Sequence, residues 1–122
     1  MHEYVICQNL VRTILGELEK QGYSPSKLLT ARVVVGKLRQ IVPEILISAY
    51  TVLSKGTGLE GSKIEIISAP VWVKCEDCGW TGKIENFNFR CGACQGGRLK
   101  IFGGKELYLK SLIIKGDEKS RD

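Results

Sequence analysis

CEDCGWTGKIENFNFRCGAC, residues 75–94, contains two C-x-x-C pairs separated by twelve residues. Each pair turns two thiolates toward one point, and a connector of this length can bring the second pair back to the first. Gly79 follows the first pair, and Gly92, Gly96 and Gly97 lie in or after the second, where a backbone that wraps around a metal needs positive φ. The spacing therefore predicts one tetrahedral metal site, whose ligands are Cys75, Cys78, Cys91 and Cys94.

The bound metal is expected to be structural Zn²⁺. Two disulfides are the first alternative, but the N-terminus MHEYVICQNL lacks the features of a signal peptide, so we expect the reducing cytoplasm, where thiols stay reduced. A four-cysteine cage also suits rubredoxin-type iron, yet no other sequence feature indicates electron transfer. Four thiolates leave no open coordination position, which is typical of a structural zinc site.

Composition describes a small globular protein. A chain of 122 residues with 43% hydrophobic and 25% charged residues fits one compact domain, or a small domain that carries a smaller module. No apolar run approaches the roughly 18 residues of a membrane span. The 18 basic and 13 acidic residues are spread without a dense block, so the net charge of +5 indicates a mildly basic surface and makes nucleic acid an unlikely partner.

Helical periodicity predicts two helices. In residues 3–21 an apolar stripe recurs at spacings of three and four, with Gly22 placed to end the helix. This stripe consists of Tyr4, Cys7, Val11, Ile14 and Leu18. Cys7 is thus expected to be a small buried hydrophobe and not a fifth ligand. A second helix should begin at Pro43, a good first helical residue, and present an apolar face that includes Ile45, Leu46 and Tyr50.

Strands are predicted over residues 27–36, with Leu29 on the same face as Ala31, and over residues 63–74, with a break near Pro70. Two more should follow the cysteines, over residues 98–102 and 105–115. We therefore expect an α+β fold, in which two helices pack on a small, about three-stranded β-sheet and a four-cysteine, zinc-ribbon-like module is inserted. The predicted domains are 1–74 plus 105–122, and the zinc-binding module 75–104.

The N-terminus could bind a second metal. The α-amino group of Met1, the amide nitrogens of His2 and Glu3, and the imidazole of His2 can close adjoining chelate rings, and the Glu3 carboxylate could add an oxygen ligand. A nitrogen-rich set with deprotonated amides is square-planar or tetragonal, which is the geometry of Ni(II) or Cu(II). Any chain that begins Met-His offers these atoms, so this pattern alone is a weak indication.

The chain resembles the HypA/HybF family of hydrogenase nickel-insertion proteins. The resemblance rests on MHE before a helix, VVVGKL, VPEILISAY, a KGT turn, the two C-x-x-C pairs and GGKELYLKSL, in this order over nearly the whole chain. It implies a metallochaperone, not an enzyme, that delivers Ni(II) to the precursor of the [NiFe]-hydrogenase large subunit in the cytoplasm. It also implies partnership with the GTPase HypB; a homodimer is one option for its assembly.

By this resemblance, His2, with Glu3 and the Met1 amine nearby, carries transferable Ni²⁺, while the four cysteines hold structural Zn²⁺. Two departures are visible. The second pair of the family is commonly C-P-x-C, where this chain has Gly92. Some members also place an acidic residue near the nickel after the first strand, where this chain has Gln40.

Two other functions fit parts of the sequence. A zinc ribbon that binds nucleic acid is the alternative function, favoured by the basic charge and by Trp80, Phe87 and Phe89 near the metal. We expect these aromatic residues to form the small core of the module instead, because a metal-stapled unit has little else to bury. A rubredoxin-like electron carrier is the second rival, which a colourless zinc-containing preparation would exclude.

Overall fold

The computed structural model describes residues 2–116, which divide into two units. The first comprises residues 2–34, 41–67 and 108–116, and the second comprises residues 35–40 and 68–107. In the second unit, Leu38 packs against the buried residues Val71 and Val73, and the predicted module of residues 75–104 stays a prediction. Among the described residues, none of the helices combines the length and the apolar character that crossing a membrane requires.

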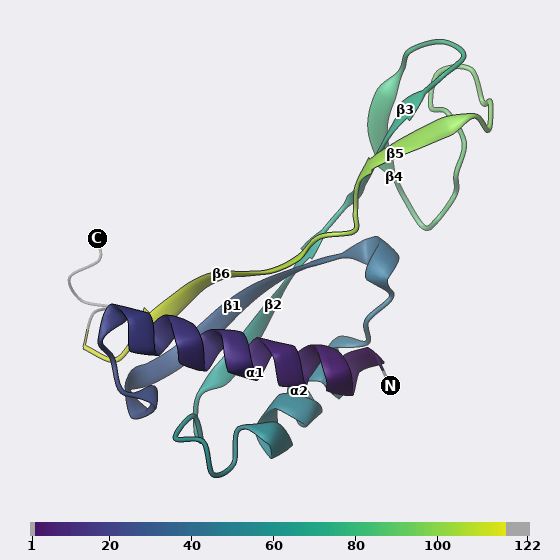
Figure 1. Ribbon diagram of the computed structural model, residues 1–122. Coiled ribbons are helices and arrows are strands. Elements are labelled where there is room, and N and C mark those ends of the chain that lie inside the picture. Colours follow the sequence, from purple (N-terminus) through teal and green to yellow (C-terminus); the bar gives the residue numbers. More distant parts are fainter. Residues whose placement is uncertain (1, 117–122) are drawn as a thin grey trace. The chain divides into compact units, whose positions relative to one another are not determined.

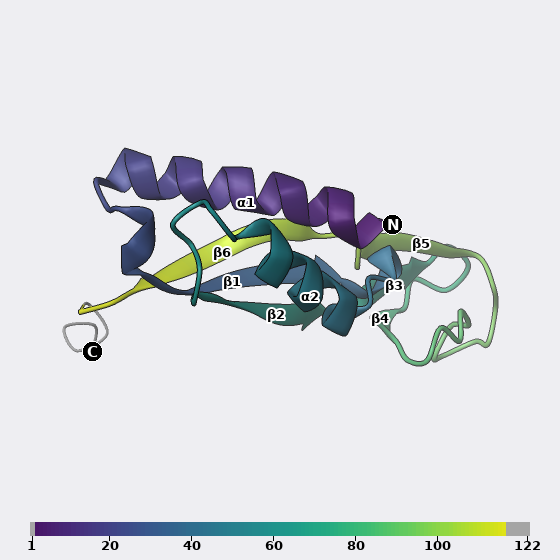
Figure 2. The ribbon, with the colours of Figure 1, turned by 90° about the horizontal axis from the view of Figure 1, so that it is seen from below.

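The first unit consists of two helices and a three-stranded sheet. The helices are α1 (His2–Gln21) and α2 (Pro43–Leu53), and a short 3-10 helix, η1 (Pro25–Lys27), follows α1. The sheet has the order β2-β1-β6, formed by β1 (Leu28–Gly36), β2 (Lys63–Ala69) and β6 (Leu107–Ile114). Helix α1 runs along one face of this sheet and packs against α2 (Figures 1 and 2). The expected α+β fold is thus confirmed.

Apolar side chains from both helices and the sheet form the core of this unit. Its most buried members are Cys7, Ile14, Leu18, Leu28, Ala31, Val33, Leu46, Tyr50 and Leu59. Burial of each large aliphatic side chain contributes about 1.5–3 kcal/mol, so this cluster is the main source of stability. Sequence periodicity was wrong for some residues that it placed on core faces, among them Tyr4, Leu29 and Ile45, which are 44%, 38% and 51% exposed.

The buried stripe of α1 begins one residue earlier than the apolar pattern indicates. Glu3 is only 7% exposed and occupies the place expected for Tyr4. The helix ends as expected, because Gly22 has φ of 83° and donates its N–H to the carbonyl of Glu19, while the N–H of Tyr23 binds the carbonyl of Leu18. These two bonds form a Schellman cap.

The second unit contains a separate antiparallel sheet of order β4-β3-β5. Its strands are β3 (Val71–Cys75), β4 (Thr81–Ile84) and β5 (Leu99–Gly103), and a short 3-10 helix, η2 (Lys37–Arg39), belongs to the same unit. Pro70 separates β3 from β2, so the long strand expected before Cys75 serves two sheets.

The core of the second unit is formed by the β3 and β4 side chains Val71, Val73 and Ile84, against which Trp80 packs. The expectation of an aromatic core is right for Trp80 and wrong for Phe87 and Phe89, which are 50% and 37% exposed. Aliphatic strand residues fill the space instead.

Candidate metal centre

The second unit brings the four predicted cysteine ligands together. The Sγ atoms of Cys75, Cys78, Cys91 and Cys94 all lie within 4.8 Å of one another. Cys75 and Cys94 are separated by 3.7 Å between Sγ atoms, and Cys78 and Cys91 by 3.4 Å. A tetrahedron with metal–sulfur bonds near 2.3 Å has edges of about 3.8 Å, so the cluster matches a four-thiolate metal site. Among residues 2–116 this is the only such group of potential ligands.

Two similar turns present these cysteines. In the first, Gly79 has φ of 84° and donates its N–H to the carbonyl of Cys75 at 3.0 Å. In the second, the equivalent residue is Gln95, which has φ of 64° and donates to the carbonyl of Cys91 at 3.0 Å. The expected glycine role is therefore right for Gly79, whereas in the second turn the left-handed position falls on a non-glycine residue.

The Trp80 indole packs against Gly92 in the second turn and against Gly82 in β4, contacts that sequence reasoning missed. A Cβ atom added to Gly82 would lie 2.3 Å from the Trp80 ring, and one added to Gly92 would lie 2.6 Å from it. The carbonyl of Trp80 also accepts the N–H of Cys75 at 2.7 Å. Gly92, which stands where the resembled family often has proline, thus leaves room for the indole.

Hydrogen bonds within the cluster favour one thiolate. Burial opposes ionisation of Cys91, but its sulfur accepts N–H groups from Cys94 and Ala93 and interacts with the thiol of Cys78, so its pKa is lowered to about 6. The N–H of Trp80 favours the Cys78 thiolate, yet hydrogen bonding to Cys91 and burial outweigh it and raise the pKa of Cys78 to about 12. Of these two cysteines, Cys91 is therefore the one whose thiolate is favoured by the surrounding N–H groups.

An ion pair joins the first turn to the strand that leaves the centre. The guanidinium of Arg98 lies 2.9 Å from the carboxylate of Asp77 and 3.9 Å from that of Glu76. The carbonyl of Arg98 also accepts the N–H of Glu76 at 2.8 Å. These groups are exposed, so the pairs contribute little stability, but they restrain the loop between the first two cysteines.

Of the predicted nickel ligands, the described residues His2 and Glu3 belong to the first unit. Met1 is outside the described residues, and His2 is the first residue of α1. Glu3 is buried, and its Oε2 accepts the N–H of Val42 at 2.9 Å. The assignment of these three residues to nickel stays a prediction.

Cys7 lies apart from this chemistry. It is fully buried in the core of the first unit, and this burial raises the pKa of its thiol to about 11. A neutral thiol with no access to solvent is neither a metal ligand nor a nucleophile. The interpretation of Cys7 as a small hydrophobic residue is therefore confirmed.

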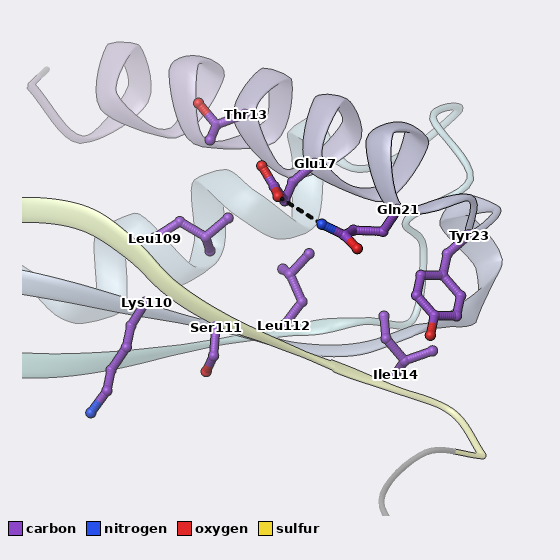
Figure 3. A pocket seen from close by; sticks show the side chains of 9 residues that line it. All are labelled: Thr13, Glu17, Gln21, Tyr23, Leu109, Lys110, Ser111, Leu112 and Ile114. Atoms are coloured by element: carbon purple, nitrogen blue, oxygen red, sulfur yellow. Dashed lines mark hydrogen bonds between the residues drawn. The ribbon is translucent and has the colours of Figure 1, made fainter.

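A cavity of about 560 Å³ lies between the C-terminal half of α1 and β6 (Figure 3). Leu112 points toward the helix and Lys110 away from it. The carboxylate of Glu17 accepts a hydrogen bond from Gln21 and is the only acidic group in the lining. One carboxylate that already has a partner does not make a metal or catalytic site. The lining residues are Thr13, Glu17, Gln21, Tyr23, Leu109, Lys110, Ser111, Leu112 and Ile114.

Comparison with known proteins identifies one family. Residues 1–114 match the family model described as HypA, "Hydrogenase/urease nickel incorporation, metallochaperone, hypA". The chain is 32% identical over 124 residues to the hydrogenase maturation factor HypA of Methanocaldococcus jannaschii, with 97% of this chain and 100% of the relative covered. It is 30% identical over 109 residues to the factor of the same name from Moorella thermoacetica, with 89% and 95% covered.

Solved structures show the same fold. The solution structure of the Ni metallochaperone HypA from Helicobacter pylori aligns with a TM-score of 0.63 at 20% identity, covering 92% of this chain and 96% of that one. A second solution structure of a HypA protein aligns with a TM-score of 0.66 at 22% identity, with 93% and 96% covered.

Proposed function

Because this chain belongs to the HypA family of hydrogenase/urease nickel-incorporation metallochaperones, we propose that it binds Ni²⁺ at its N-terminus and delivers it to a [NiFe]-hydrogenase large-subunit precursor. In this proposal the protein is a carrier and not an enzyme. A HypB-type GTPase is its partner in delivery, and the cytoplasm is its compartment, where reducing conditions keep the thiols available for metal.

The proposed nickel ligands are the α-amino group of Met1, the amide nitrogens of His2 and Glu3, and the His2 imidazole. The observation that supports this set is that α1 begins at His2. The first four N–H groups of an α-helix have no carbonyl acceptor within the helix. Amide nitrogens in this turn can therefore be deprotonated and bind a metal without breaking a hydrogen bond of α1.

The place of the site also suits release. A cation at the start of a helix meets the positive end of the helix dipole, which opposes tight binding. Ligands on a chain terminus can moreover be replaced one at a time by those of an acceptor. A carrier requires this moderate affinity, because a metal that is held too tightly cannot be transferred.

We assign Zn²⁺ to Cys75, Cys78, Cys91 and Cys94. Four thiolates saturate a tetrahedral zinc ion, so the site has no position left for exchange and its role is structural. Burial of Cys75 and Cys91, which are 1% and 0% exposed, supports the same assignment. The transferable and the structural metal are thus proposed to occupy different units.

Replacement of His2 tests the nickel site. His2→Ala, and separately an extension of the N-terminus by Gly-Ser, should abolish stoichiometric Ni²⁺ binding in calorimetry, while zinc content and circular dichroism stay unchanged. Gln8→Ala, an exposed change in the second turn of α1, is the matched control. Unchanged nickel affinity in both test variants would falsify the assignment.

Delivery needs its own experiment. Nickel-loaded protein is mixed with the metal-free large-subunit precursor in the presence of a chelator that captures released Ni²⁺. Transfer that resists the chelator and disappears with His2→Ala supports a direct hand-over. If free Ni²⁺ at the same concentration loads the precursor equally well under these conditions, the delivery role is wrong.

A further inference from the structure

The side chain of Glu3 joins the beginnings of the two helices in the first unit. Glu3 lies in the first turn of α1 and is 7% exposed. Its Oε2 accepts the backbone N–H of Val42 at 2.9 Å, although the two residues are 39 positions apart in the chain. Val42 is the N-cap of α2 and immediately precedes Pro43.

This contact provides the N-terminal cap that the residues of α2 do not provide themselves. The backbone N–H of an N-cap residue is commonly accepted by a Glu or Gln three residues later, at position N3. In α2 that position holds Ile45, and Val42 itself makes no side-chain capping hydrogen bond. A carboxylate near a helix N-terminus is also favoured by the helix dipole. Glu3 therefore stabilises the start of α2 from a different helix.

We propose that Glu3 serves the nickel site through its backbone and the fold through its side chain. This inference rests on the proposed function. The amide nitrogen of Glu3 contributes to the nickel ligand set, while its carboxylate is a positioning group that ties the first turn of α1 to α2. To reach the metal, the carboxylate would have to leave a buried place and remove the acceptor of the Val42 N–H, which is costly.

The double role of Glu3 couples the metal to α2. Nickel bound at the Glu3 amide restrains the backbone of the residue whose side chain caps α2, so the Val42 hydrogen bond should become more persistent when nickel is present. Coupling of this kind is reciprocal. Binding of nickel at the N-terminus should therefore be detectable as a change at the Val42 N–H, where α2 begins.

Amide hydrogen exchange at Val42, followed by NMR, tests the positioning role in the nickel-free protein. Glu3→Ala should accelerate exchange by roughly fivefold, the factor that corresponds to one ordinary hydrogen bond. Glu3→Gln should restore slow exchange, because its amide oxygen can accept the same N–H. Glu44→Gln, an exposed acid in the first turn of α2, is the control and should leave exchange at Val42 as in the wild type. Equal exchange rates in wild type and Glu3→Ala would overturn the proposal.

Added nickel distinguishes the two roles of Glu3. Both substitutions leave the backbone amide of residue 3 in place, and nickel should slow exchange at Val42 in wild type and Glu3→Gln but not in Glu3→Ala. If Glu3→Gln and Glu3→Ala lose nickel alike, the carboxylate is a ligand and the proposal is wrong. Faster exchange at Val42 on nickel binding to the wild type would refute it as well.

Nickel binding by the His2→Ala variant tests the proposed function independently of Glu3. If His2→Ala retains nickel, the N-terminal site itself is misplaced. The nickel-free exchange rates at Val42 then still decide whether Glu3 caps α2, since that measurement involves no metal.

Discussion

The Sγ atoms of Cys78 and Cys91, thirteen residues apart in the chain, lie 3.4 Å from each other. Cys91 is fully buried, and its sulfur accepts the N–H groups of Ala93 and Cys94. We predict that Cys91→Ser lowers zinc affinity by more than the ~10–100-fold that follows loss of an outer partner of a metal ligand. Metal analysis after dialysis against a chelator measures this effect.

Cys7→Ala is the matched control for the zinc prediction. Cys7 is fully buried like Cys91 but lies in the other unit, so its removal should lower thermal stability without any loss of zinc. A Cys91→Ser protein that kept one tightly bound zinc per chain and melted normally would contradict the four-thiolate site.

Gly79 and Gln95 occupy equivalent left-handed positions in the two cysteine turns, with φ of 84° and 64°. A side chain in this conformation costs roughly 1–2 kcal/mol. Gly79→Ala should therefore lower the free energy of unfolding of the second unit by about 1 kcal/mol. Gln95→Gly should raise it by a similar or smaller amount. Gly97→Ala, where an added Cβ meets nothing within 4 Å and φ is not positive, should have little effect.

Resistance of bound zinc to a competing chelator ranks these three variants. The expected order of resistance is Gln95→Gly, then wild type together with Gly97→Ala, then Gly79→Ala. If Gln95→Gly released zinc more readily than the wild type, the side chain of Gln95 would have a role beyond its backbone conformation.

The thiol of Cys7 should resist alkylation in the folded protein, and its contribution to stability should decrease at alkaline pH. Burial raises its pKa to about 11 from the ordinary value of 9.0, so the native state holds this proton more firmly than the unfolded state does. The contribution of Cys7 to stability is complete below pH 9.0 and is lost as pH rises toward about 11.

Mass spectrometry after iodoacetamide treatment at pH 8 tests the first part of this prediction. Cys7 should stay unmodified in the folded protein and react after addition of guanidinium. Chemical denaturation between pH 8 and pH 11 tests the second part, with Cys7→Ala expected to show the smaller decrease in stability. Rapid labelling of Cys7 in the folded, zinc-loaded protein would refute the burial.

Much of the fold and of the metal centre could be predicted from residue spacing within short segments of the sequence. Two C-x-x-C pairs suffice to predict a site with four sulfur ligands. Each pair is a local turn, and only the connector between the pairs has to bring them together. Proline at the first position of α2 and glycine after α1 likewise act on their own neighbours, so the helix boundaries followed from the residues.

Contacts between distant segments were decided only by the tertiary structure. A Cβ atom on Gly36 would lie 2.0 Å from the carbonyl oxygen of Gly104, a restriction that no local pattern contains. Glu3 took the buried place that periodicity assigned to Tyr4, because its carboxylate accepts a hydrogen bond from the distant N–H of Val42 and can therefore be buried. The sequence thus determined which residues could bind metal. Packing between remote segments decided that the side chain of Glu3, and not that of Tyr4, is buried.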